Sequence, residues 1–331
     1  MTPTSSFFVR NHFGLPEIQE SNWQLTLEFE SFKFSYSIDD LKKMSERTLA
    51  ATLECAGNSR SSFGKTVEGE IAWENGAVGT AIWSGVPLED ILSKSGIIGR
   101  KLREVIEVIF VGADGSVEEA TPIESKNRYS RSLPIGKALD PDTIVALRMN
   151  GEALPKEQGY PARLIVPGWF AMASVKWLNT IILTKEKFPF KGYFNSTKYV
   201  YLMDRNGRTE REPVTDLNVK SLITNPKTKQ NLTVGSLVTI EGKAWSGHGR
   251  ITKVEVNLGN GWQATTLVDN DKLSKYAWTS WKFEWMPTQT GKTIISVRAT
   301  DAMNNMQPEK PMMNSYLYGY NAIQHLEIRI K

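Results

Sequence analysis

The alternation of apolar and polar positions predicts that the N-terminal part of the chain is mostly strand. Apolar residues alternate with polar ones over residues 25–29, and again over residues 32–36 in the opposite phase, as in the two strands of a hairpin. Ser37 and Asp40 follow with the spacing of a capping box, which predicts a short helix directly after the hairpin. These patterns indicate an α+β chain in which β structure dominates.

The following region predicts more strands and one more short helix. A helix is expected over residues 88–94, because Gly96 supplies a C-terminal stop. Polar stretches, above all residues 118–131, are interpreted as long loops, which often carry function on a rigid frame. Five segments have the composition of strands, namely residues 48–54, 105–111, 144–149, 164–166 and 175–184.

The pattern becomes more regular in the last third of the chain. Residues 204–215 are charged and polar, and Asn225-Pro226 then interrupts the chain. Short alternating segments follow at residues 238–240, 254–258, 281–285, 295–299 and 326–330. Several short strands over ~100 residues predict an immunoglobulin-like β-sandwich. We therefore divide the chain into two domains, residues 1–218 and residues 219–331.

Length, composition and charge exclude several classes of protein. The 331 residues are enough for about two domains, and 40% hydrophobic with 23% charged residues is ordinary for a globular chain. No apolar run reaches the ~18 residues of a membrane-spanning helix. The net charge of +4 is scattered, without the basic stripe of a nucleic-acid-binding protein. The composition does not exclude a binding pocket for a small anion, because such a pocket needs only a few arginines.

Cysteine and histidine are scarce. Cys55 stands alone, so neither an intramolecular disulfide nor a zinc site with several cysteines is expected. His12, His248 and His325 are far apart, which argues against a histidine-rich metal site. Polar residues appear within the first dozen positions, so the chain as written predicts a cytoplasmic protein without a secretion signal. Removal of a leader would make a periplasmic location equally consistent.

Cys55 is the strongest candidate for chemistry. It follows a predicted strand and precedes a Gly-Asn turn and Arg60, whose charge favours the thiolate that attacks a substrate or binds a metal. The chemistry alone leaves a buried thiol, a nucleophile and a ligand of a soft metal open. A nucleophilic cysteine usually has a histidine base, and none of the three histidines is close in sequence.

The segment Cys-Ala-Gly-Asn-Ser-Arg at residues 55–60 resembles the molybdenum-binding motif of the sulfite oxidase family. Further segments resemble signatures of that family in the same order along the chain, namely residues 8–12, 159–168, 173–178, 244–250 and 320–323. The resemblance therefore covers almost the whole chain. It implies a molybdopterin-binding domain of mostly β structure, followed by an immunoglobulin-like dimerisation domain and hence a homodimer.

The resemblance also implies a cofactor. In this family one molybdopterin holds a molybdenum ion, and Cys55 would be the protein ligand, since thiolate suits such a soft site. Gln158 stands where many members have histidine, so it can donate a hydrogen bond but no charge. The implied cofactor-binding residues are Phe8, Val9, Arg10, Asn11, His12, Asp114, Gln158, Arg163, Ser174, Val175 and Lys176. Arg163 and Lys176 suit the phosphate as charge-assisted donors.

Three arginines and a tryptophan match the family's substrate pocket. Arg10, Arg60 and Arg250 would hold sulfite, because a buried oxyanion needs cationic partners and the guanidinium fork binds two oxygens. Trp73 would form part of the wall. In one departure, Phe190 occupies the position of the family's tyrosine beside the metal. Tyr193 is no simple replacement, because three positions along an extended chain point to the opposite side.

The implied reaction is the oxidation of sulfite to sulfate by oxygen-atom transfer. The electrons would leave to a separate acceptor, a cytochrome or oxygen, because a chain with one cysteine has no Cys-x-x-Cys-His haem motif. Two alternatives are kept. The same cofactor could act on another sulfur compound or reduce a sulfoxide or N-oxide, and a non-catalytic binding module is the less favoured third interpretation.

Overall fold

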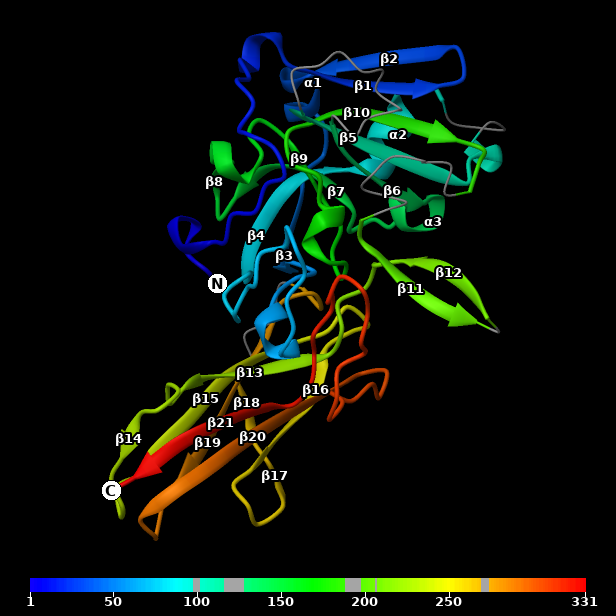
Figure 1. Cartoon of the computed structure of the whole chain (residues 1–331). Coiled ribbons are helices and arrows are strands. Elements are labelled where there is room, and N and C mark those ends of the chain that lie inside the picture. Colours follow the sequence, from blue (N-terminus) through cyan, green and yellow to red (C-terminus); the bar gives the residue numbers. More distant parts are fainter. Residues whose placement is uncertain (98–101, 116–127, 188–197, 206, 269–273) are drawn as a thin grey trace.

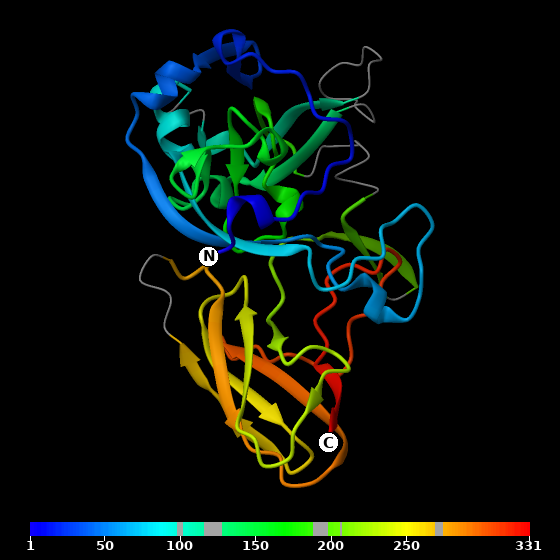
Figure 2. The same cartoon turned by 90° about the vertical axis from the view of Figure 1, so that its left-hand side faces the viewer.

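A computed structural model describes residues 1–97, 102–115, 128–187, 198–205, 207–268 and 274–331. Figure 1 shows a larger upper part built by the N-terminal two thirds of the chain and an elongated β-sandwich below it. The N-terminus lies close to the junction of the two parts, whereas the C-terminus lies at the far end of the sandwich (Figures 1 and 2).

The first sheet of the upper part has the strand order β2-β1-β10-β5-β6. Its strands are β1 (Gln24–Phe29), β2 (Phe32–Ser37), β5 (Glu107–Gly115), β6 (Arg128–Pro134) and β10 (Leu178–Thr184). Only the pairing of β1 with β10 is parallel among the pairs of this sheet. The predicted hairpin is confirmed, and Leu25 and Leu27 are fully buried on one face, as the alternation requires.

Three short α-helices accompany this sheet. They are α1 (Ile38–Lys42), α2 (Leu88–Lys94) and α3 (Ile135–Ala138). The predicted capping box is present at α1, where Ser37 and Asp40 satisfy each other's backbone N–H groups. The predicted helix over residues 88–94 is also confirmed, and Gly96 follows it with a φ of +79°.

The second sheet places the residues around Cys55. It has the order β3-β4-β7-β8, and β9 pairs with β7. Its strands are β3 (Arg47–Glu54), β4 (Val78–Pro87), β7 (Ile144–Met149), β8 (Glu152–Ala153) and β9 (Arg163–Ile165). β3 ends one residue before Cys55, and β9 begins at Arg163. The sheet therefore supplies candidate site residues from the ends of two of its strands.

Two sequence-based expectations about this part were wrong, and one strand was missed. The expected loop over residues 118–131 ends in β6, whose buried Ser130, Arg131 and Ser132 hide the strand behind a polar composition. β4 was missed because small residues dilute its apolar signal. The strand expected from residue 175 begins at Leu178, because Trp177 has a φ of +48° and breaks the extended chain.

The charged stretch over residues 204–215 is more structured than its composition suggested. Most of it belongs to a separate hairpin of β11 (Val200–Arg205) and β12 (Arg208–Pro213). This hairpin projects to one side in Figure 1. Its polar composition reflects the exposure of β12, because a strand in contact with water needs no apolar face.

The C-terminal part is a sandwich of two sheets. One has the order β13-β15-β19-β18 and the other β14-β21-β20-β16-β17. Their strands are β13 (Lys220–Asn225), β14 (Asn231–Leu232), β15 (Val238–Trp245), β16 (Ile251–Asn257), β17 (Trp262–Ala264), β18 (Thr266–Val268), β19 (Thr279–Trp285), β20 (Gly291–Asp301) and β21 (Gln324–Ile330). The first sheet corresponds to strands A, B, E and D of an immunoglobulin domain. The predicted mostly-β architecture with a C-terminal sandwich is confirmed, and the boundary at residue 218 stays a prediction.

No helix among the residues described is long and apolar enough to cross a bilayer.

The sandwich offers a matched test of its core. Ile295 on β20 is fully buried, whereas its neighbour Ile294 is 54% exposed. We expect Ile295→Ala to lower the free energy of unfolding by about 2–5 kcal/mol, since it removes apolar contacts and leaves a cavity. Ile294→Ala should change it by no more than about 0.5 kcal/mol. Urea titrations of both variants check this, and equal losses would contradict the assigned register.

Candidate functional site

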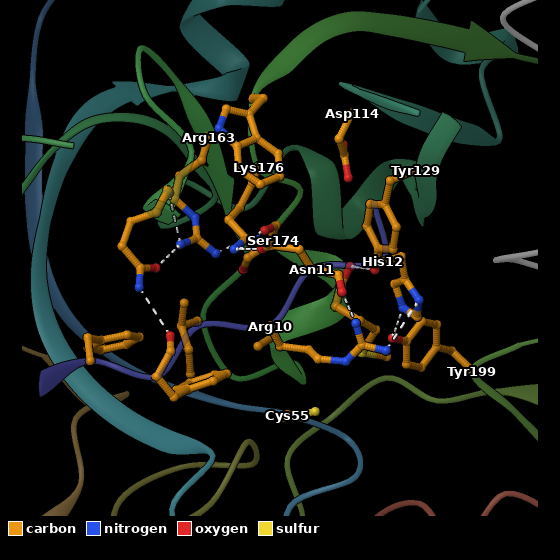
Figure 3. Close-up of a pocket in the computed structure, with 17 residues that line it drawn as sticks. Arg10, Asn11, His12, Cys55, Asp114, Tyr129, Arg163, Ser174, Lys176 and Tyr199 are labelled. Atoms are coloured by element: carbon orange, nitrogen blue, oxygen red, sulfur yellow. Dashed lines mark hydrogen bonds between the residues drawn. The ribbon is translucent and has the colours of Figure 1, made fainter. Parts of the chain in front are cut away.

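A cavity in the upper part is lined by residues from distant segments of the chain (Figure 3). The contributing segments are the chain before β1, the end of β3 and the residue after it, the strands β5 and β6, β9 with the loops on either side of it, and the residue before β11. The lining residues are Phe7, Phe8, Arg10, Asn11, His12, Leu53, Cys55, Asp114, Tyr129, Gln158, Arg163, Ala171, Met172, Ser174, Lys176, Trp177 and Tyr199.

Cys55 lies where β3 gives way to a tight turn. Its N–H donates to the carbonyl of Ala77 over 2.9 Å, and its carbonyl accepts from the N–H of Asn58 over 2.8 Å. Burial raises the pKa of the Cys55 thiol, while the charges of Arg10 and Arg60 act in the opposite direction. A bound metal cation would overcome the cost of burial and hold the sulfur as thiolate.

Two cationic side chains lie next to each other on one wall. The Arg163 guanidinium donates to the Gln158 side-chain oxygen over 3.0 Å and to the Ser174 carbonyl over 3.1 Å. Lys176 donates to Asn11 and, over 2.7 Å, to the carbonyl of Glu157. These acceptors are neutral, so the wall keeps its positive charge.

The cost of desolvating two neighbouring cations shows in their pKa values. Burial lowers the pKa of Arg163 to about 9. Burial and, next, the charge of Arg163 lower the pKa of Lys176 to about 7. An anionic group bound here would relieve both effects, because it supplies the counter-charge that the wall lacks.

Two buried polar atoms of this region also lack a hydrogen-bond partner among the residues described. They are Oδ1 of Asp114 and Nε of Arg163. Burial raises the pKa of Asp114 to about 7. Because buried polar groups are normally satisfied, an acceptor and a donor without protein partners point to a polar ligand in the cavity. The donor set fits molybdopterin, which carries an anionic phosphate together with ring N–H and carbonyl groups.

The opposite side of the cavity is aromatic. The His12 ring stacks on Tyr129 at 5.5 Å between centroids, and its Nε2 lies 2.5 Å from the hydroxyl of Tyr199. Burial and then the charges of Arg10 and Lys198 lower the pKa of His12 to about 3, so this imidazole is neutral at pH 7. Tyr199 has a φ of +54°, a strained conformation that occurs often at functional sites.

Ten residues that the sequence singled out line this cavity. They are Phe8, Arg10, Asn11, His12, Cys55, Asp114, Gln158, Arg163, Ser174 and Lys176. Two proposed cofactor-binding residues do not line it. Val9 is 42% exposed, and Val175 is fully buried in the hydrophobic core.

The proposed substrate residues are not gathered in this cavity, apart from Arg10. Arg60 is buried outside it, paired with Glu70 at 3.2 Å and bonded to the carbonyl of Ile71 at 2.7 Å. Trp73 is half-buried and Arg250 is exposed, and neither lines the cavity. Phe190 and Tyr193 lie outside the described residues.

Sequence reasoning missed several lining residues, among them Tyr129, Met172 and Tyr199. Tyr129 belongs to the segment interpreted as a loop. Tyr199 belongs to none of the motifs, and only the path of the chain into β11 brings it to the cavity. For Met172, the sequence offered one signal of a place in the site, namely its position directly before the 173–178 motif.

Comparisons with known proteins agree with this geometry. The family described as "Oxidoreductase molybdopterin binding domain" matches residues 12–193, and "Mo-co oxidoreductase dimerisation domain" matches residues 211–330. Sulfite oxidase from Gallus gallus is 32% identical over 325 residues, covering 93% of this chain and 68% of that protein. Mitochondrial sulfite oxidase from Rattus norvegicus is 30% identical and is covered over 57% of its length, so the chain spans little more than half of that relative.

Other relatives are named for different activities. Nitrate reductase [NADH] 2 of Arabidopsis thaliana is 33% identical over 343 residues, covering 95% of this chain and 37% of that protein. Among solved structures, the sulfane dehydrogenase SoxCD from Paracoccus pantotrophus aligns with a TM-score of 0.82 and 28% identity, over 99% of this chain and 80% of that one. The molybdopterin-binding match over more than half of the chain, together with the extent of the chicken alignment, shows that this chain belongs to the sulfite oxidase family.

Proposed function

We propose that this chain is a molybdenum enzyme that oxidises sulfite to sulfate. The observation that carries the proposal is the placement of a single cysteine, Cys55, in a cavity that also contains the buried Arg163, the half-buried Lys176 and the side chain of Arg10. A thiolate for the metal, cations for the cofactor phosphate and an arginine for the substrate oxyanion are thus available in one place.

The proposed cofactor is molybdopterin with molybdenum, which supplies two-electron oxidation coupled to oxygen-atom transfer when bound. Cys55 would ligate the metal through Sγ. Arg163 and Lys176 would bind the phosphate, and Asp114 Oδ1 would accept from a pterin N–H. Oδ1 of Asp114 and Nε of Arg163 support this assignment, because they lack partners among the described residues.

Arg10 is the proposed substrate-binding side chain. It reaches across the cavity towards His12 in Figure 3, with Nη2 3.4 Å from the Nδ1 of His12. A neutral His12 leaves the positive charge of Arg10 unopposed and available to an oxyanion. The hydroxyl of Tyr199, 2.5 Å from Nε2 of His12, would hold the neutral imidazole in one orientation beside Arg10.

The proposal also covers the substrate, the electron acceptor and the oligomeric state. Sulfite is favoured by the sulfite oxidase relatives, while the similarity to SoxCD favours a second candidate, another reduced sulfur compound. Reduction of a sulfoxide or N-oxide is a further alternative on the same cofactor. Electrons would pass to a separate cytochrome or to oxygen, and the C-terminal domain would form a homodimer, as the name of its matching family suggests.

The first test is the optical spectrum of the metal-loaded protein before and after anaerobic addition of sulfite. We expect a thiolate-to-molybdenum absorption band that sulfite bleaches, because sulfite reduces the metal. Cys55→Ser should abolish the band, since it removes the ligand sulfur. A band that sulfite leaves unchanged would contradict the substrate, and the same titration with thiosulfate and with dimethyl sulfoxide after reduction would then separate the alternatives.

Lys176 gives the cofactor site a specific pH dependence. With a pKa of about 7, the lysine loses its charge as pH rises from 7 to 9, whereas a phosphate ester stays a dianion over this range. Affinity of the apoprotein for molybdopterin should therefore fall as pH rises. Lys176→Arg should reduce this fall by keeping the charge at position 176, and the part that remains is due to Arg163, whose pKa is about 9. Lys176→Met should bind weakly at both pH values, by about 10-fold or more at pH 7.

Pterin fluorescence during reconstitution of the apoprotein at pH 7 and pH 9 measures these affinities. Equal affinity of the unchanged protein at both pH values would contradict a role of Lys176 as phosphate ligand.

A further inference from the structure

The turn that carries Cys55 is bonded to the C-terminal domain through Glu54. This carboxylate is only 2% exposed and accepts three hydrogen bonds. Oε1 accepts from Nζ of Lys220 and from Nδ2 of Asn58, both over 2.9 Å, and Oε2 accepts from Nε1 of Trp245 over 2.8 Å. Two of the three donors belong to strands of the sandwich, β13 and β15.

Lys220 contacts the turn on both sides of the cysteine. Besides Glu54, its Nζ donates to the hydroxyl of Ser59 over 2.8 Å. Its side chain is 1% exposed and lies against the rings of Trp245 and Tyr320, with Nζ at 5.8 Å and 6.0 Å from their centroids. One ammonium group therefore joins residues 54 and 59, which bracket the Cys55 turn.

Further contacts leave this turn little freedom. The side-chain oxygen of Asn58 accepts from the N–H of Ala77 over 3.0 Å. The carbonyl of Ala56 accepts from the N–H of Gly319, which belongs to the segment before β21, over 2.8 Å. The turn is thus held by the second sheet on one side and by the C-terminal domain on the other. This sheet and this domain meet where β3 and β13 approach each other (Figure 1).

Stability alone does not explain a buried pair of this kind. Desolvation of the two charges largely cancels their attraction, so apolar residues of the same volume would serve the fold equally well. The hydrogen bonds of the pair do, however, fix the orientation of the turn that they join. A carboxylate with three donors and an ammonium with two acceptors hold the adjacent backbone in one geometry, as partners of metal-binding residues commonly do.

We propose that Lys220 and Glu54 form an interdomain clamp that positions the Cys55 sulfur for its metal. The proposal rests on the proposed function in one respect, namely that Cys55 ligates molybdenum. Lys220 and Glu54 are positioning residues that act through the backbone of the turn. The C-terminal domain then helps to position the metal ligand, in addition to any role in dimerisation.

The decisive variant is the double substitution Glu54→Gln with Lys220→Met. It removes both charges at nearly constant volume, so thermal stability should fall much less than in a variant that removes only one charge and leaves the other buried without a partner. It also removes the ammonium that joins residues 54 and 59. We expect the thiolate-to-molybdenum band to shift and molybdenum to be lost about 10- to 100-fold faster during dialysis.

The single variant Lys220→Met should show the same spectral shift together with a lower melting temperature, because it leaves the Glu54 carboxylate buried without its counter-charge. If this single variant does not fold, the double variant still decides the question. The measurements are visible absorption and circular dichroism of the loaded protein, molybdenum content over time, and thermal unfolding.

The sandwich supplies a matched control. Glu255 and Arg298 form another ion pair at 2.9 Å, between neighbouring strands β16 and β20 and apart from the Cys55 turn. Glu255→Gln with Arg298→Met should leave the band and the molybdenum content unchanged. If the Glu54 and Lys220 double variant behaves like this control, the clamp is a structural contact only and the proposal is overturned.

Failure of the proposed function gives a different result. If the unchanged protein takes up no molybdenum, or if Cys55→Ser keeps the band, then Cys55 is not the ligand and the premise fails. If the unchanged protein and Cys55→Ser behave as expected while the double variant matches the unchanged protein, only the clamp is refuted.

Discussion

The buried ion pair between Glu54 and Lys220 is the constraint on which the geometry of this molecule depends. It joins the last residue of β3 to the first residue of β13, one position before Cys55. Neither group can be satisfied by water at 1–3% side-chain exposure. Any other docking of the two domains that keeps either group buried would leave a charge without its partner, which disfavours such arrangements. The same requirement fixes the turn at the cavity.

Close backbone packing completes the junction. The N–H of Leu217 donates to the carbonyl of Gly168, and the N–H of Gly247 donates to the carbonyl of Leu217, both over 2.8 Å. A Cβ at Gly247 would lie 2.2 Å from the Gly168 oxygen, so only glycine permits this approach. This accounts for part of the 244–250 motif, whose Arg250 is exposed. In the structure its Trp245 and Gly247 build the interdomain contact.

The cavity has the opposite character, because its charges are not balanced by the protein. Arg163 and Lys176 are bonded to neutral acceptors, and Asp114 is itself disfavoured as an anion by burial. Folding thus leaves desolvated cations and polar atoms without protein partners facing one space. Such an arrangement costs stability and is relieved by an anionic ligand, which distinguishes a binding site from a packing defect. The charged groups at the domain junction are paired with other protein groups, whereas those of the cavity require a bound ligand.

The sequence by itself determined the local features of this protein. Alternation predicted the first hairpin and the sandwich, and the Ser37 and Asp40 spacing predicted the start of α1. The residues next to Cys55 singled out that cysteine, and Arg163 and Lys176 followed from the resemblance of contiguous motifs to the sulfite oxidase family. These signals are local, because side-chain period and capping depend on neighbours a few residues away. Tertiary structure decided the rest. It brought Tyr199 into the cavity, kept Arg60 outside it beside Glu70, and paired Glu54 with Lys220 across 166 positions of the chain. Such contacts follow from how sheets and loops pack, which local periodicity does not specify.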